Sequence, residues 1–227
     1  MNRRQFGIAL AAAGLGLPLG AARGSAAQPR LPRRPLPVPS NGTIRTAVAI
    51  GPGVNVIDMS GPWEVFQDAA IAHAAGRFEL YTVAPRTRPV EASGGLRIDP
   101  DYSYDTAPQP DLVVIPAHDS THRTTDWLRR VARHADLLMS VCTGAFVLAE
   151  TGLLDGKTAT THHQSLDMLA SDHPRVHVVR GRRFVEHDRV ATAGGLTSGI
   201  DLALRVVERY LGPDAARLTA EYMEYGR

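Results

Sequence analysis

Cys142, the only cysteine in the 227 residues, is the side chain best placed to do chemistry. It follows the apolar run LLMSV and directly precedes TGAFVLAE, which predicts a buried strand that turns at once into a helix. Such a turn exposes the nucleophile and points the free N–H groups of the helix at it, which lowers the pKa of a thiol. Gly144, two residues later, permits the close backbone approach that this turn requires. The alternative is a buried, inert cysteine that acts as a small apolar residue.

The elements that must position Cys142 alternate between strand and helix patterns after residue 43. This alternation is typical of a parallel sheet covered by helices. Strands are predicted at residues 46–50, 78–84, 111–116, 136–142, 158–161, 176–179 and 184–192, with an irregular hairpin at 91–103. Helices are predicted at residues 62–75, 125–134, 143–150, 164–170, 196–210 and 214–225.

The first 42 residues are predicted to lie outside the folded domain, which we place at residues 43–227. Residues 1–27 combine an Arg3-Arg4 pair, an apolar Ala/Gly/Leu-rich stretch and small residues at the end, as in a twin-arginine export signal. The stretch is too short and too interrupted for a membrane anchor, so we expect cleavage, a periplasmic or secreted protein and no membrane contact afterwards. Residues 28–42 hold five prolines among basic residues and predict an extended tether.

Charge and cysteine content argue against a nucleic-acid-binding protein and a disulfide-stabilised one. The formal net charge is +2, but residues 1–42 carry six arginines and no carboxylate, so residues 43–227 carry −4. Bulk charge therefore gives no support to nucleic-acid binding. One cysteine in an exported chain cannot form an intramolecular disulfide framework.

Three separated segments resemble the ThiJ/PfpI superfamily, which is class I glutamine amidotransferase-like. They are IDMSGPWEVF at residues 57–66, VCTGAFVLAETGLLDGK at 141–157 with ATTH at 159–162, and TAGGLTSGIDLAL at 192–204. Within the superfamily they are most similar to isonitrile hydratases and to amidase-like domains of some transcription regulators. The resemblance implies a flavodoxin-like three-layer α/β sandwich with a mostly parallel sheet, a homodimer, a small-molecule substrate and no cofactor.

The resemblance also implies roles for three residues. In isonitrile hydratases the cysteine works with an aspartate and with the threonine that follows it, which correspond here to Asp58, Cys142 and Thr143. Cys142 would add to the terminal carbon of an isocyanide, Asp58 would act as acid and base, and Thr143 would supply an orienting hydroxyl and a backbone N–H. Asp58 could instead be a helix N-terminal charge, with Glu64 as the fallback carboxylate.

His162 lies in a Thr-Thr-His segment whose histidine is close to the cysteine in the superfamily. It either forms a Cys–His pair or only lines the pocket. Two departures change the expected site. Thr143 stands where many members have histidine, which disfavours a peptidase or glutaminase triad. Ala117 and His118 stand where relatives commonly have two glycines that approach an oxyanion, so we expect substrate contacts from Ala117, His118 and Gly144 in an altered form. The alternative for His118 is a histidine of a surface loop.

Metal and phosphate sites are not expected. His118 and His122 have helical ligand spacing but no evident third ligand. The glycines of residues 194–199 lack the Lys-Ser/Thr of a phosphate loop and predict a tight strand-to-helix turn near Cys142. The sequence therefore predicts a cysteine-dependent hydratase or hydrolase of a small electrophile. The alternatives are a thiol-based redox sensor or ligand-binding protein, and a glyoxalase-like enzyme in which Cys142 and His162 act together.

Overall fold

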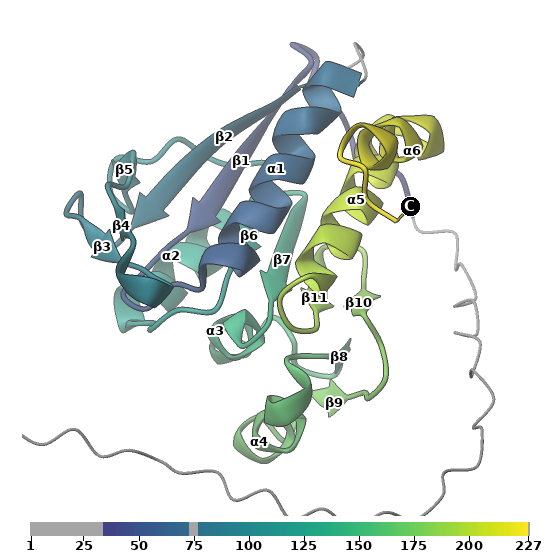
Figure 1. Cartoon of the computed structure of the whole chain (residues 1–227). Coiled ribbons are helices and arrows are strands. Elements are labelled where there is room, and N and C mark those ends of the chain that lie inside the picture. Colours follow the sequence, from purple (N-terminus) through teal and green to yellow (C-terminus); the bar gives the residue numbers. More distant parts are fainter. Residues whose placement is uncertain (1–33, 73–76, 227) are drawn as a thin grey trace, which may run out of the picture. The chain divides into compact units, whose positions relative to one another are not determined.

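A seven-stranded sheet forms the centre of the computed structural model, which describes residues 34–72 and 77–226 (Figure 1). The strand order is β10-β11-β7-β6-β1-β2-β5, and every neighbouring pair is parallel except β10 and β11. The predicted mostly parallel sheet is confirmed. The strands are β1 (Thr43–Ala49), β2 (Arg77–Ala84), β5 (Tyr102–Ser103), β6 (Leu112–Ile115), β7 (Leu137–Val141), β10 (Phe184–Glu186) and β11 (Val190–Ala193).

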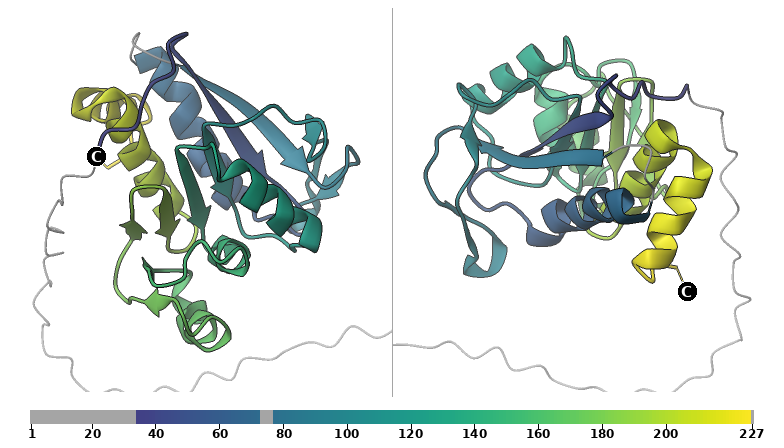
Figure 2. Two further views of the ribbon diagram at one scale, coloured as in Figure 1. Left: turned by 180° about the vertical axis from the view of Figure 1, so that it is seen from behind. Right: turned by 90° about the horizontal axis from the view of Figure 1, so that it is seen from above.

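Helices cover both faces of the sheet, as Figure 2 shows from above. In β6, Leu112 and Val114 join the core beneath one helical layer, whereas Val113 and Ile115 join the core beneath the other. Burial on both faces explains why this strand is an unbroken apolar run. The predicted three-layer sandwich is confirmed. One layer holds α1 (Val56–Ala72), α5 (Ser198–Leu211) and α6 (Pro213–Tyr222), and the other holds α2 (His122–Val131) and α3 (Gly144–Glu150).

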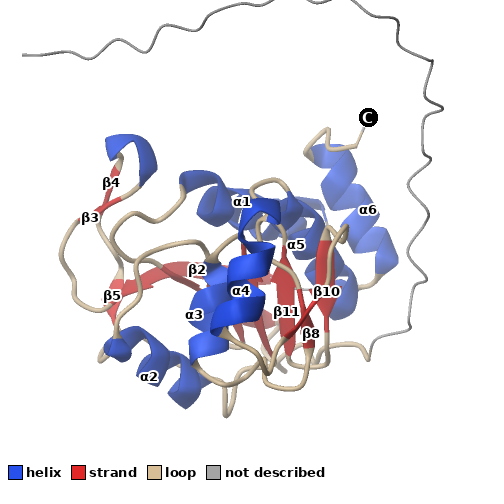
Figure 3. Ribbon diagram, turned by 90° about the horizontal axis from the view of Figure 1, so that it is seen from below, coloured by secondary structure: helices blue, strands red, loops and turns tan. Residues whose placement is uncertain are grey.

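Smaller elements lie around the sheet (Figure 3). The predicted irregular hairpin is present, with a 3-10 turn between its two antiparallel strands. Among the described residues, no helix is both long and apolar enough to cross a membrane. The smaller elements are β3 (Val90–Glu91), β4 (Arg97–Ile98), β8 (Thr158–Ala159), β9 (His177–Val178), α4 (Leu166–Asp172) and the 3-10 turns Ser93–Gly95 and His163–Ser165.

Helix α1 begins six residues before its predicted start at Pro62. Asn55 caps the helix, because its Oδ1 accepts the backbone N–H of Asp58 at 3.4 Å. Pro62 lies inside the helix, where packing of Val65 and Phe66 into the core outweighs its missing hydrogen bond. This early start places Asp58 in the first turn of α1.

The strand predicted over residues 184–192 is wrong as a single element. It is an antiparallel hairpin of β10 and β11, which a short turn separates. The backbone N–H of His187 donates to the carbonyl of Val190 at 2.7 Å and closes that turn. After the turn, β11 begins at Val190, which pairs with Leu138 of β7.

The tether predicted over residues 28–42 is wrong for its described part. Leu36 is buried in the core, and its N–H donates to the carbonyl of Arg209 at 2.8 Å. The buried guanidinium of Arg209 donates to the carbonyl of Arg34. Residues 34–42 therefore belong to the domain. The predicted export signal and residues 28–33 of the predicted tether lie outside the described residues.

Candidate active site

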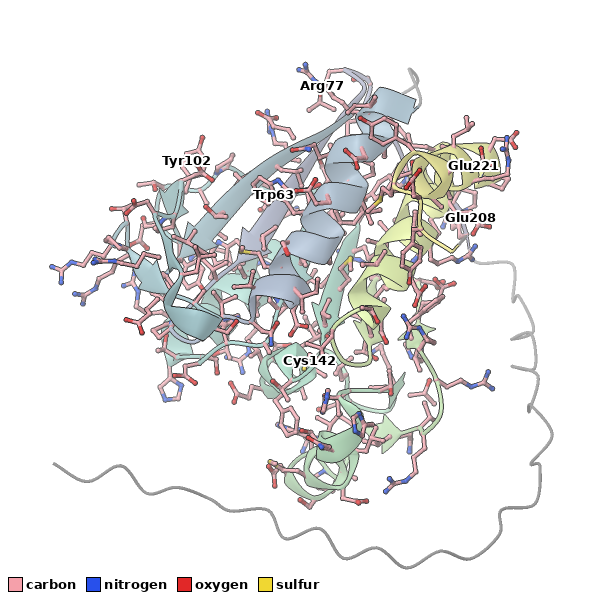
Figure 4. All side chains as sticks on the ribbon, in the orientation of Figure 1. Trp63, Arg77, Tyr102, Cys142, Glu208 and Glu221 are labelled. Atoms are coloured by element: carbon pink, nitrogen blue, oxygen red, sulfur yellow. The ribbon has the colours of Figure 1, made fainter. Side chains whose placement is uncertain are left out.

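Cys142 lies on the turn between β7 and α3, as the sequence predicts (Figure 4). Its φ of 58° is in the left-handed region, which a residue other than glycine rarely adopts. Two hydrogen bonds hold this conformation. The Cys142 N–H donates to the Gly194 carbonyl at 2.8 Å, and the buried Thr161 hydroxyl donates to the Cys142 carbonyl at 2.8 Å. A strained backbone that is fixed from both sides is typical of functional sites.

Gly144 allows the first turn of α3 to approach the end of β6. A Cβ atom at this position would lie 2.1 Å from the Ile115 carbonyl oxygen and 2.8 Å from the Pro116 carbonyl oxygen. No side chain fits in that space, since both contacts are with backbone atoms. Gly144 is thus a packing requirement of the elbow, the turn at Cys142 that joins the end of β7 to the start of α3.

Asp58 is fully buried beside Cys142. Its Oδ2 accepts the Ala117 N–H at 3.4 Å, and its Oδ1 has no hydrogen-bond partner among the described residues. Burial raises the pKa of Asp58 from 3.8 to about 6, and contacts with the Ala117 N–H, the Cys142 thiol and the Leu196 N–H offset part of that rise. Asp58 can therefore exchange a proton near neutral pH.

Cys142 differs from the exposed, acidic thiol that the sequence predicts. The residue is only 7% exposed, and burial raises the pKa of its thiol from 9.0 to about 11. The negative charge of Asp58 raises the pKa further, whereas the N–H groups of Thr143 and Leu196 lower it. The prediction of a lowered thiol pKa is wrong, because burial and a neighbouring carboxylate outweigh the N–H groups. In the resting site the proton therefore stays on sulfur.

Ala117 and His118 have partners other than the expected oxyanion. The Ala117 N–H donates to Asp58, and the His118 Nδ1 hydrogen-bonds the Pro116 carbonyl at 2.8 Å. The His118 ring packs against Gly51, where burial lowers its pKa. Its Nε2 is buried without a partner among the described residues. Ala117 thus contributes to the site through its N–H, which donates to Asp58. His118 instead packs inside the loop that carries Ala117.

His162 lies beside the elbow without a described hydrogen bond to Cys142. Its ring fills the space next to Gly195, where a Cβ atom would lie 2.2 Å from the His162 Cδ2. The His162 Nδ1 accepts the Gln164 N–H at 3.4 Å. The groups with the largest effects on the pKa of Cys142 do not include His162. This arrangement favours a wall of the site over a Cys–His pair.

Leu196 is the site residue that the sequence does not predict. Its φ of 52° is left-handed, and its N–H contacts both the Cys142 thiol and the Asp58 carboxyl. The only sequence signal is the glycine pair before it, which predicts a tight turn near the elbow. Within the described residues, no group of three or more His, Cys, Asp or Glu side chains could hold a metal ion.

Comparisons with known proteins place the chain in a family. Residues 44–209 match the DJ-1/PfpI family. The isonitrile hydratase of Pseudomonas putida is 32% identical over 77% of this chain and 75% of that protein. The transcriptional regulator CdhR of Pseudomonas aeruginosa is 30% identical over 78% of this chain and 53% of that protein.

A solved structure shows the same fold. It is a ThiJ/PfpI family protein from Pseudomonas syringae, with a TM-score of 0.73 and 24% identity. The match covers 92% of this chain and 84% of that structure. Since the family match spans most of the domain and includes Asp58 and Cys142, the chain belongs to the DJ-1/PfpI family.

Proposed function

We propose that this protein is a cysteine-dependent hydratase that converts an isocyanide and water into an N-substituted formamide. The observation that carries the proposal is the buried pair of Asp58, with a pKa of about 6, and Cys142, with a pKa of about 11. A base of this strength beside a thiol suits addition in which the proton leaves sulfur as the carbon–sulfur bond forms.

In the first step, the Cys142 sulfur bonds to the terminal carbon of the isocyanide. Asp58 accepts the thiol proton and delivers it to the same carbon, which forms a carbon–hydrogen bond and yields a thioimidate. All atoms of the thiol and the isocyanide are retained in this adduct, and Asp58 returns to its carboxylate form. Because a carboxyl with a pKa near 6 both accepts and donates protons near neutral pH, one group serves both transfers.

In the second step, water adds to the thioimidate carbon and gives up one proton to Asp58. Asp58 passes that proton to the nitrogen, then takes the hydroxyl proton as the carbonyl forms and the carbon–sulfur bond breaks. It returns this second proton to sulfur, so the products are the formamide and the free thiol. The N–H groups of Thr143 and Leu196 face the sulfur and would stabilise the negative charge that it carries as it leaves. This role for the Thr143 N–H fits the isonitrile hydratase resemblance.

Two observations support this proposal over the alternatives. The isonitrile hydratase of Pseudomonas putida is similar over most of both chains. The raised pKa of Cys142 weighs against redox sensing, because the thiolate is the form that oxidants attack. Regulators and DJ-1 proteins share the fold, so the site and not the fold carries the argument.

The test is formation of N-cyclohexylformamide from cyclohexyl isocyanide by purified protein under reducing conditions. Wild type is expected to turn over, and C142A is expected to lose turnover because it lacks the nucleophile. Glu64→Gln is the matched control, since Glu64 is an exposed carboxylate on the same helix as Asp58. Equal turnover by C142A and wild type would overturn the proposal.

A further inference from the structure

A cavity of about 410 Å³ lies away from Cys142, near the amino-terminal ends of β7 and β11. Leu138 in its wall is on β7, four residues before Cys142, which is about 13 Å at the rise of a β-strand. The volume is in the range of small-molecule sites. The lining residues are Ala132, Leu138, Leu153, Lys157, His187, Asp188, Arg189 and Val190.

Lys157 is the only lysine in the chain, and the other 24 of its 25 basic residues are arginines. It is half-buried in the cavity wall, just before β8. Its ammonium group has no hydrogen bond or ion pair with the described residues. By contrast, Arg175, whose carbonyl accepts the N–H of Gly156, the residue before Lys157, is paired with Asp155 at 2.8 Å. A half-buried cation without a partner, on the wall of a cavity, is available to an anion.

Two of the other polar groups of the cavity, Arg189 and His187, are held by hydrogen bonds within the protein. Arg189 donates to the carbonyls of Ala132 and Ala135 at 2.6 and 2.7 Å, which fixes its guanidinium at the end of α2. His187 Nε2 hydrogen-bonds the Thr158 carbonyl at 2.9 Å. With Asp188 counted against Lys157 and Arg189, the lining carries a formal charge of +1, which matches a monoanion.

The rest of the lining is apolar. The apolar residues come from four places in the fold: Ala132 caps the end of α2, Leu138 is on β7, Leu153 follows α3 and Val190 is on β11. Four apolar side chains from separate elements, with a single available cation among them, suit a ligand with an apolar body and one charged end.

We propose that this cavity is a second ligand site, which binds a small carboxylate with an apolar body through Lys157. The site is separate from the Cys142–Asp58 pair and does not depend on the hydratase reaction. Benzoate is the probe. Benzamide has the same shape without the charge, and acetate has the charge without the apolar body.

Because Lys157 is the only lysine, reductive ¹³C-methylation labels one side chain, and K157Q identifies its signal by removing it. The modified lysine keeps its positive charge. Benzoate is expected to shift this signal saturably, whereas benzamide and acetate shift it at least tenfold less at equal concentration. No saturable shift with benzoate, or an equal shift with benzamide, would overturn the proposal.

Variants separate this site from Cys142. Calorimetric titration with benzoate is expected to show at least a tenfold weaker affinity for K157Q, which breaks no hydrogen bond or ion pair among the described residues, and for Leu153→Trp, which fills the cavity. C142A is expected to bind benzoate as wild type does, whether or not the protein hydrates isocyanides. Unchanged affinity in K157Q, in protein whose thermal midpoint matches wild type, would refute the site.

Discussion

The carboxyl of Asp58 and the thiol of Cys142 share one buried site in which the carboxyl is the stronger acid. The pKa of Asp58 is about 6 and that of Cys142 is about 11, so the proton remains on sulfur until an electrophile arrives. The negative charge of Asp58 contributes to the high thiol pKa. Asp58 thereby suppresses the free thiolate and supplies the base that the addition needs.

This relationship predicts opposite effects of Asp58→Asn on two reactions of Cys142. Removal of the negative charge lowers the thiol pKa, so alkylation by iodoacetamide at pH 8.5 should become faster. Loss of the acid and base should lower kcat/KM for the isocyanide by about 100-fold or more. Both rates are measured on the same preparation, with Glu64→Gln as the control. A parallel fall of both rates would contradict the assigned role.

The raised pKa of Asp58 also predicts a pH-dependent stability difference. Because the pKa of Asp58 is higher in the folded state, ionisation of this carboxyl destabilises the folded state relative to the unfolded state. This destabilisation is small near pH 4, where the folded state keeps the proton, and reaches its full size above about pH 6. Asp58→Asn removes this cost. Its stability relative to wild type should therefore rise by roughly 2 kcal/mol between pH 4 and pH 7.5. Urea unfolding at both pH values measures the difference, and no change between them would contradict the burial cost.

Gly144→Ala should damage the elbow. The new methyl group would lie 2.1 Å from the Ile115 carbonyl oxygen, so β6 and α3 must separate. We expect a loss of about 3 kcal/mol or a failure to fold. Gly61→Ala is the matched control, because its methyl would meet only the Ile200 side chain, at 3.0 Å. Equal unfolding midpoints for the two variants would show that the close approach is not required.

Arg209→Met should release residues 34–42 from the domain. The buried guanidinium donates to the carbonyls of Arg34, His187 and Asp188, all of which lose a donor. We expect a loss of about 2 kcal/mol and faster proteolysis before β1. Arg217→Met, which removes only exposed ion pairs, should change stability by less than about 0.5 kcal/mol. Proteolysis at the wild-type rate would contradict the anchoring role.

Much of the fold and the elbow is predictable because the signals are local. Buried strands such as β6 and β7 are continuous apolar runs, and the helix pattern begins directly after Cys142. The thiol pKa is not predictable in this way. It depends on burial by distant segments and on Asp58, which lies 84 positions earlier in the chain.

Other differences arise where a local signal is ambiguous. Pro62 reads as a helix start, and only packing of α1 shows that Asn55 is the cap. Leu36 stands among prolines, so its burial against the domain depends on Arg209, far along the chain. Leu196 acts through its backbone N–H, which almost every residue type has, so the residue type at this position does not reveal the contact.

The most direct test of the central claim is the mass of the Cys142 peptide after rapid acid quench of wild type with p-nitrophenyl isocyanide. If Cys142 is the nucleophile, its peptide should show a transient mass increase equal to one isocyanide. The increase should form and decay as the formamide appears, and it should be absent from C142A. Formamide production at the wild-type rate without this adduct, or by C142A, would contradict covalent catalysis by Cys142.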